Sequence, residues 1–205
     1  MKYNNMIQYK SKPIIIAICG KSATGKDTLS RCLVSNLKHC GYAAQIIVSD
    51  TTRPPRENEV DGVDYNFLTN KQFYDKIDSR QYLEYSKFNG WLYGTNITAI
   101  SDNKINVGVF NPEGLESLAL WKEQYNIVCI YLNCVFFKRL YRSFLREEQK
   151  IKKEHFRRLY SDYCSFKGIG QKQESFPTIV INTGHFSMSN QLRQVFCFFK
   201  DNKIL

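Results

Sequence analysis

The chain has 205 residues, of which 43% are hydrophobic, so it is long enough to bury a core and suits one domain with inserted lobes. Its net charge is +10, from 29 basic and 19 acidic residues. Anionic substrates and solvated lysines account for this excess, and nucleic-acid contact is the less favoured explanation because no nucleic-acid-binding signature is present.

The first predicted elements are a strand, a glycine loop and a helix. Residues 13–19 form a short apolar run rich in isoleucine, and a helical pattern begins near Lys26. Between them, Gly20 and Gly25 permit backbone dihedrals that turn amide N–H groups inward, while the helix dipole and Lys26 add positive charge. The pattern predicts a polyphosphate site, with a chance glycine loop as the weaker alternative. Its candidate residues are Gly20, Ser22, Ala23, Thr24, Gly25, Lys26, Asp27 and Thr28.

The loop departs from the common motif directly after its lysine. Asp27 stands where Ser or Thr is usual, and the hydroxyl comes one place later, at Thr28. Asp27 fits a first-turn acid favoured by the helix dipole, but a carboxylate beside phosphates repels them unless Mg²⁺ or its water shell lies between. We therefore expect Asp27 and Thr28 to be the metal-binding candidates.

A second anion-binding pattern follows the loop. Arg53 and Arg56 lie three residues apart around a Pro-Pro turn, and offer planar, charge-assisted donors to a nucleoside monophosphate. The hydroxyls of Tyr65 and Tyr93 can complete the oxygen shell of the phosphate without adding charge. These four residues are predicted to bind a monophosphate.

The same segment contains hydrogen-bonding groups whose chemistry is compatible with a nucleobase such as guanine. One carboxylate, that of Glu84, can accept both the N1–H and N2–H groups of the base, while O6 needs donors such as the hydroxyls of Ser49 and Thr95. Taken singly, each feature also fits a turn, a strand or a surface acid. Their order after a phosphate loop favours the functional interpretation.

Strand and helix alternate along the rest of the chain, which predicts an α/β fold with a mainly parallel sheet and helices on both faces. The expected strands are 43–48, 105–110, 127–132 and 178–181, and the expected helices include 69–77, 112–124 and a terminal helix ending near Lys200. A polar linker is expected from residue 167 to residue 175.

Charged helices are expected in residues 134–166. Phosphoryl transfer needs cations that follow the moving charge and exclude water, so a lid is expected in this segment. Each of its arginines also fits a solvated amphipathic helix. The catalytic candidates, in addition to Lys26 and Arg53, are Arg142, Arg146, Arg157 and Arg158.

With these motifs in view, residues 13–95 resemble guanylate kinases, P-loop enzymes that phosphorylate GMP. The resemblance implies a P-loop NTPase-type sheet flanked by helices, ATP as phosphoryl donor with Mg²⁺, and GMP or dGMP as acceptor. It implies a core made of residues 13–48, 96–133 and 176–205, an inserted GMP-binding lobe at 49–95, and a helical lid at 134–166. It places Asn182 near the base of ATP. The resemblance also implies the roles of two groups of residues in the small lobe: Arg53, Arg56, Tyr65 and Tyr93 fall where the family binds the monophosphate, and Ser49, Glu84 and Thr95 fall where it reads guanine.

The clearest departure from this family lies at residues 109–114. Val109 and Asn111 stand where the family has carboxylates, so the handling of magnesium or of the sugar is expected to differ. Asn111 is kept as a substrate-binding candidate. Two alternatives stay open: a related scaffold domain that binds phosphopeptides without catalysis, and a kinase for another (deoxy)nucleoside monophosphate. The intact phosphate loop favours an enzyme.

Seven widely spaced cysteines without a C-x-x-C pair are typical of small buried hydrophobes in a reducing compartment. No stretch approaches membrane-spanning length. We therefore expect a cytoplasmic protein without a membrane partner, either a monomer or a homodimer.

Overall fold

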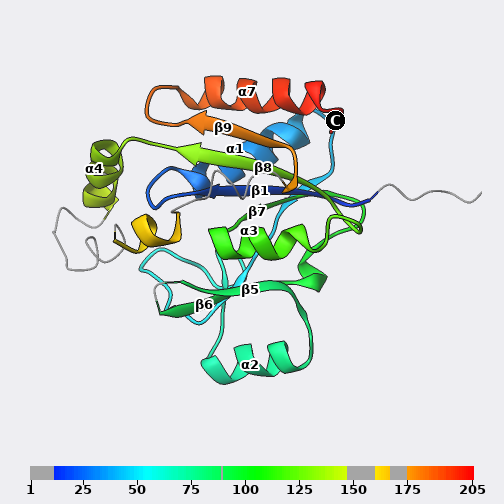
Figure 1. Cartoon of the computed structure of the whole chain (residues 1–205), viewed down its shortest axis with the longest axis vertical. Coiled ribbons are helices and arrows are strands. Elements are labelled where there is room, and N and C mark those ends of the chain that lie inside the picture. Colours follow the sequence, from blue (N-terminus) through cyan, green and yellow to red (C-terminus); the bar gives the residue numbers. More distant parts are fainter. Residues whose placement is uncertain (1–11, 89, 147–159, 167–174) are drawn as a thin grey trace, which may run out of the picture.

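A five-stranded parallel sheet forms the centre of the molecule (Figure 1). The computed structural model describes residues 12–88, 90–146, 160–166 and 175–205. In spatial order the strands are β2 (Ala44–Ile46), β7 (Ile105–Val109), β1 (Ile14–Gly20), β8 (Asn126–Asn133) and β9 (Thr178–Asn182). The middle strand is buried on both faces, which explains its continuous run of isoleucine, alanine and cysteine.

Helices cover both faces of this sheet (Figure 1). On one face, Ile16 and Ile18 of β1 belong to a core that includes α1 (Lys26–His39) and α7 (Met188–Asp201). The alternate residues Ile15 and Ala17 point to the opposite face and belong to a second core with α3 (Pro112–Ala119). The expected α/β fold with a mainly parallel sheet is confirmed.

A smaller mixed sheet lies beside the main one, in the order β4 (Asn66–Phe67), β3 (Asp50–Thr51), β6 (Trp91–Asn96) and β5 (Tyr82–Phe88). The helix α2 (Asn70–Asp78) begins at a capping box. The carboxylate of Asp50 is fully buried and accepts hydrogen bonds from Asn66, Lys76 and Tyr82. These bonds satisfy the charge inside the small lobe and join its sheet to α2.

Two helical pieces belong to the expected lid segment: α4 (Phe136–Arg146) and residues 160–165. The rest of that segment and most of the expected linker lie outside the described residues. The prediction of a helix over 112–124 was too long, because α3 ends at Ala119 and turns follow. There the Trp121 indole donates to the carbonyl of Leu83 at 2.8 Å, which fixes the turn against β5.

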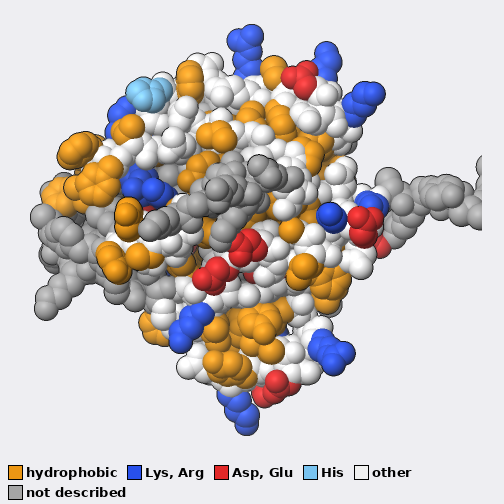
Figure 2. Space-filling model, in the orientation of Figure 1, with side chains coloured by type: hydrophobic (Ala, Val, Ile, Leu, Met, Phe, Trp, Pro, Cys, Tyr) orange, Lys and Arg blue, Asp and Glu red, His pale blue; other side chains and the backbone are white. Residues whose placement is uncertain are grey.

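Among the described residues, the Lys and Arg side chains visible in Figure 2 are scattered over the face shown and do not gather in one patch. Within the described ranges, no helix is long and apolar enough to span a membrane.

Candidate active site

The phosphate loop connects β1 to α1 through three residues with positive φ angles. Gly20, Ala23 and Gly25 have φ angles of 155°, 59° and 99°. A Cβ on Gly20 would lie 2.6 Å from the carbonyl oxygen of Leu132, so the close approach of β8 requires glycine at this position. Lys26 Nζ folds back over the loop and donates to the carbonyl of Gly20 at 2.8 Å.

A buried ion pair braces the loop from the lid side. The carboxylate of Asp162 accepts the backbone N–H of Ser22 at 3.0 Å and its hydroxyl at 3.0 Å, and pairs with Arg139 Nη1 at 2.8 Å. Asp162 is 1% exposed. Neither Asp162 nor Arg139 was predicted, because their contacts with the loop join residues more than 110 positions apart and no local motif marks them.

Arg142, the first of the predicted lid arginines, lies against the same loop. Its Nη1 donates to the carbonyl of Thr24 at 3.4 Å, and its Nη2 donates to the carbonyl of Thr183 at 3.0 Å. The hydroxyl of Thr24 itself turns inward to the carbonyl of Lys21. Arg142 therefore connects α4, the loop and the end of β9.

The other lid candidates are less well placed. Arg146 is the last residue of α4, and its side chain, like the whole of Arg157 and Arg158, lies outside the described residues. Asn182 ends β9, where its side-chain oxygen accepts from Asn133 at 3.1 Å. The roles of these four residues stay predictions.

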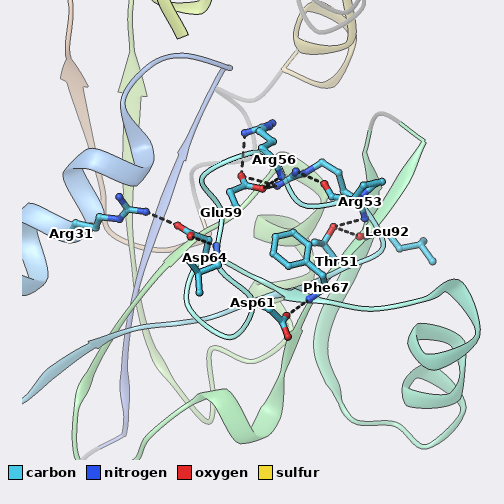
Figure 3. Close-up of polar contacts among 11 residues, drawn as sticks. Arg31, Thr51, Arg53, Arg56, Glu59, Asp61, Asp64, Phe67 and Leu92 are labelled. Carbon is cyan, nitrogen blue, oxygen red and sulfur yellow. Dashed lines mark hydrogen bonds and ion pairs between the residues drawn. The ribbon is translucent and has the colours of Figure 1, made fainter. Parts of the chain in front are cut away.

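The two arginines of the small lobe converge on one carboxylate, that of Glu59 (Figure 3). Arg53 Nη2 contacts both oxygens of Glu59, at 2.8 and 3.0 Å. The backbone N–H of Arg56 donates to the same carboxylate at 2.9 Å, and its guanidinium approaches to 3.4 Å. Glu59 was missed from the sequence, although its place three residues after Arg56 is a spacing at which side chains in a turn can meet.

Aromatic rings support these arginines. The guanidinium of Arg53 lies 5.4 Å from the ring centroid of Tyr65 and 5.7 Å from that of Phe67. The rings of Tyr65 and Tyr93 pack edge to face, 6.0 Å apart. Burial raises the pKa of the Tyr65 hydroxyl, and the charge of Asp27 acts in the same direction. Tyr65 is therefore a neutral donor at physiological pH.

Two of the three predicted base-reading residues, Glu84 and Thr95, lie on adjacent strands, and Ser49 directly precedes the next strand, β3. Glu84 on β5 is paired with Thr95 on β6, whose hydroxyl donates to Glu84 Oε1 at 2.7 Å. Asp50 lies opposite Gly94 in the antiparallel pair of β3 and β6, so continuing this register places Ser49 opposite Thr95. The row across the sheet is therefore Ser49, Thr95, Glu84. Thr95 is fully buried and contacts Glu84, whereas Ser49 and Glu84 line the cavity.

Burial raises the pKa of the Glu84 carboxyl to about 7, against the opposing effect of the Thr95 hydroxyl. Desolvation disfavours the charged form, and within the described ranges no basic side chain forms an ion pair with this carboxylate. A ligand with two adjacent N–H donors would supply the missing stabilisation.

Asn111 lies next to Glu84 at the start of α3. Its side-chain oxygen accepts the backbone N–H of Gly114 at 2.7 Å, and its nitrogen donates to Ser86 Oγ at 2.7 Å. A Cβ on Gly114 would lie 2.6 Å from Glu84 Oε2 and 3.2 Å from Asn111 Oδ1, so both side chains meet at this glycine.

One cavity of about 780 Å³ joins the phosphate loop to the small lobe. Its size falls within the range of small-molecule sites. Most of the predicted site residues line it: Gly20, Ser22, Ala23, Gly25, Lys26, Asp27, Thr28, Ser49, Arg53, Arg56, Tyr65, Glu84, Tyr93, Asn111 and Arg142.

The donor set of the cavity is compatible with a magnesium ion carried by phosphates. Asp27 and Thr28 are exposed at its wall and offer a carboxylate and a hydroxyl, which are hard oxygen ligands. Within the part of the chain that the structure describes, no group of three His, Cys, Asp or Glu residues forms a metal cage. These two residues fit a cation whose remaining ligands are phosphate oxygens and water.

Comparisons with known proteins point to one family. The family model described as guanylate kinase matches residues 10–184. The guanylate kinase of Schizosaccharomyces pombe is 37% identical over 99 residues, which cover 48% of this chain and 46% of the relative. That of Thermotoga maritima is 32% identical over 121 residues, covering 58% and 56%. The chain thus spans about half the length of the curated relatives it matches.

A solved structure supports the fold. The crystal structure of guanylate kinase from Anaplasma phagocytophilum superposes with a TM-score of 0.64 and covers 95% of this chain and 88% of its own. Only 16% of the aligned residues are identical, so this likeness concerns the arrangement of the elements.

Proposed function

The chain belongs to the guanylate kinase family, and from this premise we propose that it transfers the γ-phosphoryl group of ATP to GMP, and also to dGMP. The observation that carries the proposal is the single cavity lined by both the phosphate loop and the Arg53–Arg56 turn. Two anion sites on one cavity suit a reaction in which one phosphorylated ligand attacks another.

The phosphate loop and Lys26 would bind the phosphates of ATP. Gly20, Ala23 and Gly25 hold the loop in its turned conformation, and the N-terminus of α1 favours negative charge. Lys26 Nζ already lies over the loop, bonded to the carbonyl of Gly20, so a small movement of its flexible stem brings the charge to a phosphate.

The small lobe would bind GMP. Arg53 and Arg56 would exchange part of their contact with Glu59 for phosphate oxygens, with the hydroxyls of Tyr65 and Tyr93 as further donors. Glu84 would accept the N1–H and N2–H groups of the base. Adenine has an acceptor at N1 and would meet the ionised carboxylate with lone pair against lone pair.

Catalysis would then be positioning and charge stabilisation. The monophosphate oxygen attacks the γ-phosphorus in line, the bond to the β-phosphate oxygen of ATP breaks, and ADP leaves, so neither a covalent enzyme intermediate nor a dedicated general base is needed. Lys26, Arg53 and Arg142 are the described cations that would face the transferring group. Magnesium, held by Thr28 and Asp27 with the phosphates, would neutralise part of the phosphate charge.

The test is a coupled assay of ADP release with ATP and magnesium across the nucleoside monophosphates. We expect GMP and dGMP to be phosphorylated and AMP, CMP and UMP to be poor acceptors. Faster turnover of AMP or UMP than of GMP would show a kinase for another nucleotide. Absence of turnover at saturating magnesium, together with binding of a phosphopeptide, would show a scaffold domain instead.

A further inference from the structure

The orientation of the Asn111 side chain is fixed by its surroundings. A backbone N–H can only donate, so the atom of Asn111 that faces the N–H of Gly114 must be the amide oxygen. The amide nitrogen therefore points toward Ser86, whose hydroxyl accepts at 2.7 Å. An amide nitrogen carries two N–H groups, and within the described residues Ser86 is its one hydrogen-bond acceptor. A second donor is thus available at the wall of the cavity.

This donor lies on a defined side of Glu84. Oxygen Oε1 of Glu84 faces Thr95, and beyond Thr95 the strand register places Ser49. Oxygen Oε2 lies beside Gly114, the residue whose backbone N–H donates to the N-cap Asn111. Across the pocket the groups follow in one order: the hydroxyls of Ser49 and Thr95, the carboxylate of Glu84 and the amide of Asn111. A 6-oxopurine with O6 toward Ser49 and N1–H on Glu84 therefore has its 2-position beside Asn111.

We propose that Asn111 is a specificity-determining residue that presents an N–H donor to the 2-position of the purine, so that 6-oxopurine monophosphates are accepted with or without a 2-amino group. The proposal rests on the function proposed above. The 2-amino group of GMP gains one acceptor, Glu84 Oε2, but meets a donor on its other side. IMP has only a C–H at this position. Its binding is therefore weakened less beside the Asn111 amide than it would be beside a second carboxylate at position 111.

The experiment compares GMP and IMP as acceptors in the full chain, with kcat/KM from ADP release and Kd from calorimetry, at pH 8. Asn111→Asp keeps a good helix cap and replaces the donor by an acceptor. We expect it to raise the preference for GMP over IMP by about tenfold, the effect of one charge-assisted hydrogen bond. Asn111→Ser also keeps the cap and removes the donor without adding charge. It should raise the same ratio by a smaller factor.

Asn96→Asp is the matched control. Asn96 caps the short helix η1 (Ile97–Ala99) through the same kind of side-chain oxygen, but it does not line the cavity. The ratio of kcat/KM for GMP to kcat/KM for IMP should stay at the parent value in this variant. Thermal melting of all variants checks that the caps are intact.

The outcomes separate this inference from the proposed function. If the parent transfers phosphate to neither nucleotide, the proposed function fails, while the ratio of the two Kd values still judges Asn111. An unchanged ratio in both Asn111 variants overturns the inference even where GMP is a good substrate. If kcat/KM falls by the same factor for IMP and for GMP in these variants, Asn111 likewise acts only as a helix cap.

Discussion

Two arginine–carboxylate pairs of the same length, 2.8 Å, lie in the two regions that we propose to bind anions, but their carboxylates contact different partners. Asp162 binds Arg139 and also the main chain of the phosphate loop at Ser22. Glu59 binds the guanidinium groups that face the acceptor side of the cavity. The first pair braces the phosphate loop at Ser22, whereas the second occupies the arginines that we propose as donors to the acceptor phosphate. Only the second is therefore expected to exchange with a ligand.

The largest expected effect comes from breaking the brace. Asp162→Ala leaves Arg139, 7% exposed, without its partner. Removing one member of a buried pair costs about 3–5 kcal/mol, which for a chain of this size lowers Tm by about 6–20 °C. Glu123→Ala is the matched control, because its pair with Lys12 is exposed and should contribute less than about 1 kcal/mol. Equal Tm values for the two variants would show that Asp162 is no brace.

On the donor side, Lys26→Ala should lower kcat by about 100- to 1,000-fold, because it removes a charge directed at the transferring phosphoryl group. The free energy of unfolding should change little, since Lys26 Nζ donates to the loop carbonyls of Gly20 and Lys21 and fills no part of the core. Steady-state kinetics and a melting curve on the same preparation measure both. Near-normal turnover would remove the phosphate loop from the mechanism.

On the acceptor side, Arg53→Ala should raise the KM for GMP by about 10- to 100-fold, the value of charge-assisted hydrogen bonds to a phosphate. The KM for ATP should stay within about twofold if the two sites are separate. Calorimetry with GMP alone isolates binding from catalysis. If Arg53→Ala bound GMP as tightly as the parent, the exchange between Glu59 and phosphate would not take place.

The base pocket should respond to pH. Burial raises the pKa of Glu84 to about 7, and two N–H donors from guanine would lower it again by stabilising the carboxylate. GMP binding should therefore release a proton near neutral pH, and affinity should fall as pH falls through 7, by up to about tenfold per unit. Calorimetry in buffers of different ionisation enthalpy measures the proton. In Glu84→Gln the part of the proton release and of the pH dependence that comes from this carboxyl should vanish, which leaves the part that comes from the monophosphate, whose second pKa is about 6.

The same shift affects stability without ligand. The unfolded carboxyl has the lower pKa, so the folded state binds more protons between about pH 4.5 and 7. The free energy of unfolding attributable to Glu84 therefore falls as pH rises through this window. Urea titrations of the parent and Glu84→Gln at pH 5 and pH 8 would reveal the difference.

The smallest expected effect concerns Asp27. If its carboxylate helps to hold magnesium with Thr28, Asp27→Asn should raise the magnesium concentration needed for half-maximal activity by a fewfold, because a neutral amide is a weaker ligand for a hard cation. A role limited to the helix dipole would change stability by about 0.3–1 kcal/mol and leave the magnesium curve in place. Superimposable titrations would therefore assign Asp27 to the helix alone.

Local spacing in the sequence was enough to find the features that depend on neighbours in the chain. The phosphate loop needs glycine at two fixed places beside a strand and a helix, and these appear within residues 13–37. The alternation of apolar runs likewise predicted the parallel sheet, because each strand buried on both faces must be hydrophobic throughout. The end of α3 was misjudged, since a bond from Trp121 to the distant Leu83 fixes the turn that follows it.

Only the tertiary structure showed which side chains orient the site. Asp162 reaches Ser22 across 140 positions, and the direction of the Asn111 amide depends on Gly114 and Ser86 together. Sequence patterns report residue types and separations along the chain, whereas these contacts depend on which elements pack against one another. The candidate phosphate-binding residues could thus be named from the sequence, but the brace behind the loop and the orientation of the Asn111 amide required the folded arrangement.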